Sequence, residues 1–190
     1  MRADCYKAGA RQRVCQSDFR PCPSSPSPAN PVPEDVVTGT IKTPDGVRLR
    51  FARWAPPPGR KGTVCLFQGR AEFIEKYFET VRDLRARGFA VATFDWRGQG
   101  LSERALRNPR KGYVRDFSDY GIDLATFVHE VVLPDCPPPV FALAHSMGAT
   151  VLTARSLCGP PLVRPHGAAL AADRAARSAP GGRDPQRSSR

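Results

Sequence analysis

Three short apolar runs, separated by segments with helical periodicity, constrain the fold of this chain more than any other feature. The runs are T-V-C-L-F within residues 62–69, A-V-A-T-F within 89–96 and V-F-A-L-A within 139–145. Runs of this length that are apolar at nearly every position are typical of strands buried on both faces of a parallel sheet. Strands and helices in alternation predict an α/β fold with a mostly parallel sheet and right-handed crossover helices.

The segments around these runs complete the pattern. Residues 38–54 form two alternating runs around a Pro-Asp-Gly turn, which predicts a β-hairpin. Apolar residues recur at helical spacing over 73–84, where Gly88 is placed to end the helix. A second helix is predicted over 117–131, ended by Pro134. The order of elements is therefore hairpin, then strand and helix in turn.

The chain divides into three parts by composition. Residues 1–35 are rich in proline and serine, which predicts a disordered arm. Residues 36–158 hold nearly all aromatic and β-branched side chains and form the expected globular domain. Residues 159–190 are rich in alanine, arginine, proline and glycine and have no sustained apolar period, although 168–177 could form a marginal helix. We expect this segment to be a low-complexity tail.

The charge of the chain does not point to a nucleic-acid partner. The formal net charge is +11, but the basic residues are dispersed among acids and small residues. No stripe of lysine and arginine interleaved with aromatic residues is present, so nucleic-acid binding is not expected. A solvated basic surface explains the charge, and transient contact with a membrane surface stays open. The N-terminus has no apolar run typical of a signal peptide or membrane span, which favours a cytoplasmic location.

The cysteines do not predict a metal site. None of the six lies in a C-x-x-C pair, and the spacing of Cys5, Cys15 and Cys22 matches no known ligand pattern. Cys65 lies within an apolar run and is expected to be a small core residue. No metal is therefore expected.

The motif A-H-S-M-G at residues 144–148 follows the third apolar run and precedes a helix predicted over 147–157. A serine on a sharp strand-to-helix turn is the nucleophile of many acyl-transfer enzymes, and the turn needs small flanking residues. Here these are Ala144, in place of the usual glycine, and Gly148. We interpret Ser146 as a nucleophile; the alternative is a serine that only caps the helix N-terminus.

Two further motifs follow the other apolar runs. Q-G-R-A-E at residues 68–72 follows the first run, at a strand end where an oxyanion-binding loop is expected. The two backbone N–H donors are then expected from Arg70 and from Met147, the residue after the serine. Gly69 could equally be a plain turn glycine. D-W-R-G-Q-G-L-S at 95–102 lacks the third glycine of a dinucleotide fingerprint and is expected to shape the wall of the site.

Together these motifs carry a family resemblance. Residues 37–158 resemble the amino-terminal part of an α/β-hydrolase of the lysophospholipase and monoacylglycerol lipase type, also grouped as serine aminopeptidase-like hydrolases. The motifs are Q-G-R-A-E-F-I-E-K-Y, D-W-R-G-Q-G-L-S and L-A-H-S-M-G-A, in that order. The resemblance implies Ser146 as nucleophile, Arg70 and Met147 as oxyanion-hole donors, and hydrolysis of a lipid or small acyl ester without a cofactor.

The acid and the base of a catalytic triad cannot be identified. In this fold the order along the chain is serine, then aspartate or glutamate, then histidine. After Ser146 the only histidine, His166, precedes the only acids, Asp173 and Asp184. We therefore expect an α/β-hydrolase fold truncated after the nucleophile turn, and hypothesise that 159–190 replaced the family's second half, for instance through a frameshift.

The two remaining histidines are poor substitutes for a triad base. His145 adjoins the serine, so its side chain is expected on the opposite face, in a structural packing role. His129 lies in the second predicted helix among apolar residues and is expected on the helix surface or in the core.

Two main functions follow. The first is a serine hydrolase acting on lysophospholipids, monoacylglycerols or similar esters. The second is a catalytically inactive fragment or binding module that uses the same cleft. A third, weaker alternative is a protein that binds RNA or a membrane surface through the basic tail. The expected partner is a small lipid or ester, and no obligate protein partner is inferred.

Overall fold

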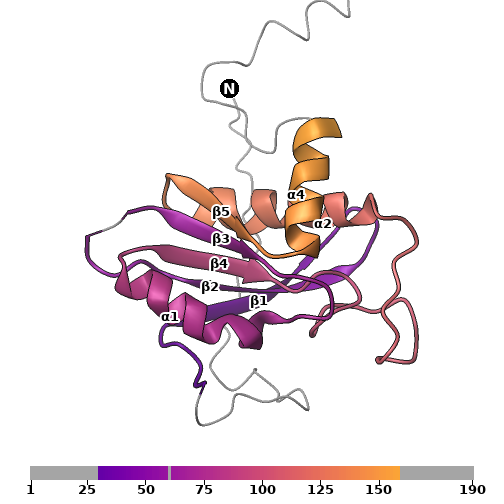
Figure 1. Ribbon diagram of the computed structural model, residues 1–190, viewed down its shortest axis with the longest axis horizontal. Helices are drawn as coiled ribbons and strands as arrows, with labels where there is room; N and C mark the ends of the chain where they lie inside the picture. Colours follow the sequence, from indigo (N-terminus) through magenta and orange to yellow (C-terminus); the bar gives the residue numbers. More distant parts are fainter. Residues whose placement is uncertain (1–29, 60, 159–190) are drawn as a thin grey trace, which may run out of the picture. The chain divides into compact units, whose positions relative to one another are not determined.

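The structure is a computed structural model that describes residues 30–59 and 61–158 (Figure 1). The proline-rich arm, apart from its last six residues, lies outside the described residues. So does the expected tail at 159–190, with its marginal helix.

A five-stranded sheet in the order β1-β2-β4-β3-β5 forms the centre of the described domain. Its strands are β1 (Val36–Lys42), β2 (Arg48–Trp54), β3 (Thr63–Phe67), β4 (Ala90–Phe94) and β5 (Val140–Ala144). The predicted hairpin is confirmed, since β1 and β2 pair antiparallel, and β2 continues antiparallel onto β4. The three predicted apolar strands are the parallel part, in which β3 lies between β4 and β5.

Helices cover both faces of this sheet (Figure 1). One face carries the 3-10 helix η2 (Ile74–Tyr77) and α1 (Phe78–Ala86), and Gly88, with φ of +94°, follows the end of α1 as predicted. The opposite face carries α2 (Asp119–Phe127) and α4 (Met147–Cys158). Helices on both faces are what a parallel sheet with crossover connections requires.

The two faces have different cores. On the α1 face the buried cluster is aliphatic and aromatic: Ala52, Trp54, Ile74, Phe78, Val81 and Val91. On the α2 face the core is a set of packed rings in which Phe127 lies 4.7 Å from Phe94 and 6.2 Å from Phe67, between ring centroids. Aromatic pairs at these separations add on the order of 1 kcal/mol each to the free energy of burial. The parallel strands are therefore anchored from both sides.

The second predicted helix differs from the structure at both of its ends. It begins at Asp119 rather than residue 117, and it continues beyond Phe127 as the π-helix η3 (Val128–Val132) and the short α3 (Leu133–Asp135). Pro134 therefore does not end it. The Leu133 N–H donates to Val128 O, a wider π turn, and Pro134 then lies in the first turn of α3, where a missing N–H leaves no hydrogen bond unmade.

A buried ion cluster ties the loop after β4 to the hairpin. The guanidinium of Arg50 donates to both oxygens of Glu75, at 2.6 and 2.8 Å, and to Asp95 at 2.7 Å. Asp95 in turn accepts from the N–H groups of Ile74, at 3.0 Å, and Leu101, at 2.8 Å. Since buried charges are tolerated only when paired and hydrogen-bonded, this cluster fixes where the loop begins.

Candidate active site

Ser146 lies on the sharp turn between β5 and α4, as the sequence predicts for a nucleophile. Its φ of +48° is in the left-handed region, and its side chain is exposed. A non-glycine residue in this conformation costs on the order of 1–3 kcal/mol and is found mainly where function requires it. The predicted strained turn is therefore confirmed, while the role of the serine stays a prediction.

Gly148 allows the first turn of α4 to pack directly against β3. A Cβ at this position would lie 2.6 Å from Phe67 O and 2.8 Å from Gln68 O, both backbone atoms that cannot move aside. The Gly148 N–H donates to His145 O at 3.0 Å, which closes the turn around Ser146. This close approach explains why a small residue is needed at position 148, as predicted.

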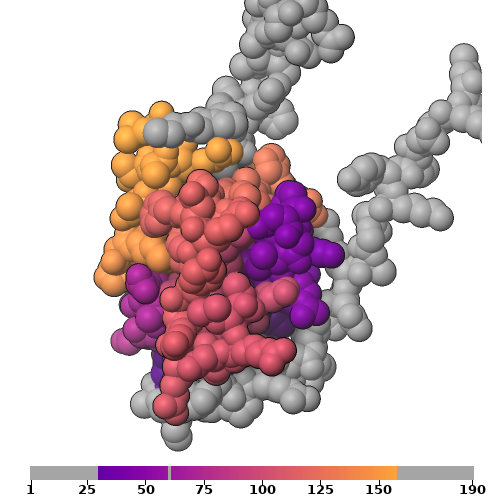
Figure 2. Space-filling model, turned by 90° about the vertical axis from the view of Figure 1, so that its right-hand side faces the viewer, coloured from indigo at the N-terminus to yellow at the C-terminus, as the bar shows by residue number. Residues whose placement is uncertain are grey.

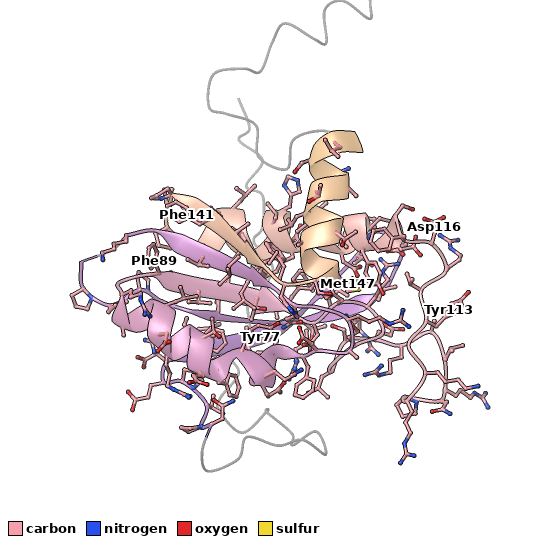
Figure 3. The ribbon with its side chains drawn as sticks, viewed as in Figure 1. Tyr77, Phe89, Tyr113, Asp116, Phe141 and Met147 are labelled. Atoms are coloured by element: carbon pink, nitrogen blue, oxygen red, sulfur yellow. The ribbon has the colours of Figure 1, made fainter. Side chains whose placement is uncertain are left out.

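Pairing of β3 with β5 brings the two expected oxyanion donors to the same end of the sheet. The register places Phe67 beside Ala144, and the His145 N–H donates to Phe67 O at 2.9 Å. The loop that contains Arg70 therefore leaves β3 next to the serine turn, and Met147 lies at the base of α4 (Figure 3). Within residues 30–59 and 61–158, neither the Arg70 nor the Met147 N–H donates a hydrogen bond.

Glu72 holds the loop after β3 against the serine turn. Its carboxylate accepts from the Gly69 N–H at 2.7 Å and the Tyr77 hydroxyl at 2.5 Å, and its Oε2 lies 3.2 Å from His145 Nδ1. Burial alone would raise the pKa of Glu72, but these hydrogen bonds and one from Lys76 lower it to about 2. The residue belongs to the Q-G-R-A-E motif, yet nothing in the sequence assigned it this role.

Gln99 holds the same loop from the other side. Its Oε1 accepts a hydrogen bond from the N–H of Ala71, which has a positive φ of +59°. The loop after β4 therefore contacts the loop after β3, in agreement with the expected wall role of D-W-R-G-Q-G-L-S. A cavity of about 600 Å³ opens between these two loops, lined among others by Arg70 and Gln99.

Neither of the histidines in the described part of the chain forms a hydrogen bond with the Ser146 hydroxyl. His145 is more exposed than its expected packing role implies, with 64% of its side chain exposed, and its ring contacts Glu72. His129 is exposed on η3, one of the two expected placements. His166, Asp173 and Asp184 lie outside the described residues.

The second serine of the motifs, Ser102, has a structural role. It is buried, its Oγ donates to Asp95 O at 2.6 Å, and it accepts from the Arg50 N–H at 2.9 Å. It therefore links the loop after β4 to β2 and is not free to react.

Neither a candidate metal site nor a membrane-spanning helix is found in the part of the chain that the structure describes. No group of three or more histidine, cysteine or carboxylate side chains there could hold a metal ion. No helix in those residues is long and apolar enough to cross a membrane. Cys65 is buried in β3, as predicted, and burial raises the pKa of its thiol to about 12. That cysteine is therefore a core residue and not a nucleophile.

Comparison with known proteins identifies the family of this chain. The sequence pattern of the family described as serine aminopeptidase, S33, matches residues 58–174. The chain belongs to this family. Lysophospholipase L2 of Escherichia coli is 41% identical over 110 residues, which cover 57% of this chain and 32% of that protein. A monoglyceride lipase homolog of Monkeypox virus is 33% identical over 100 residues, covering 52% of this chain and 34% of its own length. The matched segment thus spans about a third of the length of these two relatives.

Comparison with solved structures identifies the fold of the described domain. An α/β-hydrolase from a Penicillium species has a TM-score of 0.54 at 17% identity, covering 65% of this chain and 42% of that one. An α/β-hydrolase from Novosphingobium aromaticivorans has a TM-score of 0.50 at 19% identity, with coverage of 64% and 40%. The described domain therefore has the α/β-hydrolase fold over the part that it shares with these proteins.

Proposed function

We propose that this chain carries the nucleophile and oxyanion-binding loop of a carboxylester hydrolase. The observation that carries the proposal is the left-handed φ of +48° at Ser146, on an exposed turn between a parallel strand and a helix. Such a turn presents the serine hydroxyl at the carboxyl ends of the strands, where α/β folds bind their ligands. A serine that only caps a helix needs no such strain.

In the proposed reaction, Ser146 Oγ attacks the carbonyl carbon of the ester. Its proton passes to a general base and then to the leaving alcohol, and water hydrolyses the resulting acyl-serine. The carbonyl oxygen becomes an oxyanion, to which the N–H groups of Met147 and Arg70 would donate. Loss of a single such donor typically lowers kcat by about 10²–10³-fold.

The general base is the group that the described residues do not supply. Across 30–59 and 61–158 the histidines are His129 and His145, and the ring of His145 contacts Glu72. On this ground we also propose the second function, a catalytically inactive fragment or binding module that uses the same cleft and has at most slow hydrolysis. A site with binding and an oxyanion hole but without its triad retains about 10³–10⁴-fold acceleration over water.

The proposed substrates are lysophospholipids or monoacylglycerols, because the similar proteins are named lysophospholipase L2 and monoglyceride lipase homolog. No cofactor, nucleic acid or protein partner enters the proposed reaction. The cytoplasmic location stays a prediction.

Hydrolysis of a short-chain nitrophenyl ester by the full chain tests the proposal. We expect slow hydrolysis above the buffer rate that Ser146→Ala removes. Ser156→Ala is the matched control, because Ser156 is exposed on the same helix and its Oγ only donates to Leu152 O, at 2.9 Å. Equal loss in both variants would overturn the assignment of Ser146. Turnover typical of an esterase would instead show that a general base is present in the chain.

A further inference from the structure

The cavity beside the loop after β3 has walls from three segments. These are residues 70–73, residues 98–104 in the loop after β4, and residues 109–114 farther along that loop, with Tyr120 of α2 also lining it. Its volume of about 600 Å³ is in the range of small-molecule sites. In Figure 2 the segment that follows β4 occupies the centre of the face turned to the viewer, and in Figure 3 Tyr113 projects from this segment.

The lining of the cavity is positively charged. Three arginines, Arg70, Arg104 and Arg110, face one carboxylate, Glu72. That carboxylate is already occupied by the Gly69 N–H, the Tyr77 hydroxyl and Lys76. The cavity therefore has an excess of positive charge that its own acid does not neutralise.

The arginines that line the cavity are of two kinds. Arg104 is fixed, because its guanidinium donates to the carbonyl oxygens of Gly98 and Gly100. Arg70 and Arg110 form no ion pair with any carboxylate in the described residues. Both of these side chains are exposed, whereas the buried Arg50 is paired with Glu75 and Asp95.

Arg70 spans the cavity from the loop after β3 to the opposite wall. Its Nη2 lies 3.5 Å from the position that a Cβ would take on Gly112. Burial raises the pKa of Tyr120, while the nearby Arg70 acts in the opposite direction, which places the guanidinium charge close to that hydroxyl. The backbone of Arg70 thus belongs to the proposed oxyanion loop, while its side chain lies in the cavity.

We infer that this cavity binds a phosphate ester, with Arg70 and Arg110 as its charged donors. Guanidinium groups match phosphate oxygens bidentately, and unpaired arginines in a concave site favour a dianion or monoanion over a neutral group. Because the cavity adjoins the proposed oxyanion loop, the phosphate is that of a lysophospholipid headgroup or of a free small phosphate ester. The headgroup assignment rests on the proposed function; the phosphate site itself does not.

Binding of glycerol 3-phosphate to the full chain, measured by titration calorimetry at physiological salt, tests the site. We expect glycerol 3-phosphate to bind and glycerol not to bind. Arg70→Gln and Arg110→Gln should each weaken binding about tenfold. Arg107→Gln is the matched control, because Arg107 is exposed in the same loop but does not line the cavity. Binding that Arg107→Gln weakens equally would be general attraction to a basic chain and would overturn the site, as would no binding by folded wild-type protein.

A second binding experiment distinguishes the two possible ligands, a lysophospholipid headgroup and a free small phosphate ester. A lysophospholipid and a monoacylglycerol with the same acyl chain are compared for binding to Ser146→Ala protein, which removes hydrolysis from the measurement. If the headgroup occupies the cavity, Arg110→Gln in this background lowers the preference for the lysophospholipid about tenfold. An unchanged preference would overturn the headgroup assignment. Failure of the hydrolase proposal would show only in the ester assay, since neither binding arm needs turnover.

Discussion

At the scale of single residues, the candidate site depends on two backbone positions and one carboxylate. Ser146 adopts a left-handed conformation, Gly148 permits helix and strand to touch, and Glu72 joins the loop after β3 to the serine turn. The first two could be predicted, because a strained turn with small neighbours has a sequence pattern. Glu72 could not, because its link to the serine turn is a contact with His145, 73 residues away in the sequence.

Gly148→Ala should destabilise the protein. The added Cβ would meet the backbone oxygens of Phe67 and Gln68 at 2.6 and 2.8 Å, so helix and strand must separate. Overpacking of this kind lowers the free energy of unfolding by about 1–3 kcal/mol, measurable by urea denaturation. Gly121→Ala is the matched control: it lies in α2 with open space at its Cβ, and alanine there should add about 0.5–1 kcal/mol. Equal effects at both positions would contradict the close approach.

Glu72 should make the stability depend on pH in the acid range. Its pKa falls from the ordinary 4.5 to about 2 in the folded protein, so the folded state binds fewer protons than the unfolded chain between these values. The stabilisation is therefore complete above pH 4.5 and is lost as the pH falls towards 2. In thermal unfolding from pH 5 to 2, Glu72→Gln should flatten this decline. Glu130→Gln makes the same substitution at an exposed glutamate on η3 and should leave the decline unchanged. An identical decline in the wild type and both variants would refute the role of Glu72.

At the scale of secondary-structure elements, β5 is the described strand whose pairing edge and apolar side chains are covered least. It pairs with β3 along one side, and no other described strand pairs with it. Val140, Phe141 and Leu143 are 43–47% exposed, although Phe141 makes an edge-on contact with Phe89 (Figure 3). The sequence predicts a strand buried on both faces, and here it is half-exposed. An apolar strand with a free edge promotes association between chains.

We therefore expect the full chain to associate as its concentration rises. Val140→Lys, at the start of β5 and away from Ser146, should lower the apparent mass in size-exclusion chromatography, because a charged edge strand resists pairing. Leu106→Lys adds the same charge in place of an exposed leucine in the loop after β4 and should have little effect. A chain that elutes as a monomer at every concentration would contradict this prediction.

At the scale of the whole molecule, the order of elements and the fold could be predicted from the sequence because the signals are local. Apolar runs and turn glycines are read from neighbouring residues. What could not be predicted depends on distant contacts. The Arg50 cluster joins a hairpin strand to residues 25 and 45 positions away, and the cavity arginines come from two loops. The prediction that the second helix ends at Pro134 failed for another reason. A π turn changes the position at which proline is tolerated in a helix.

The central claim is that Ser146 is the reacting nucleophile, and its most direct test is modification of the full chain by a fluorophosphonate, followed by mapping of the adduct by mass spectrometry. Oxyanion stabilisation acts on this reaction even without a triad base, so Ser146 should react at least about 100-fold faster than the exposed Ser156. We expect one adduct, on Ser146, that persists in Ser156→Ala. Modification of another serine in its place, or of Ser146 no faster than Ser156, would contradict it.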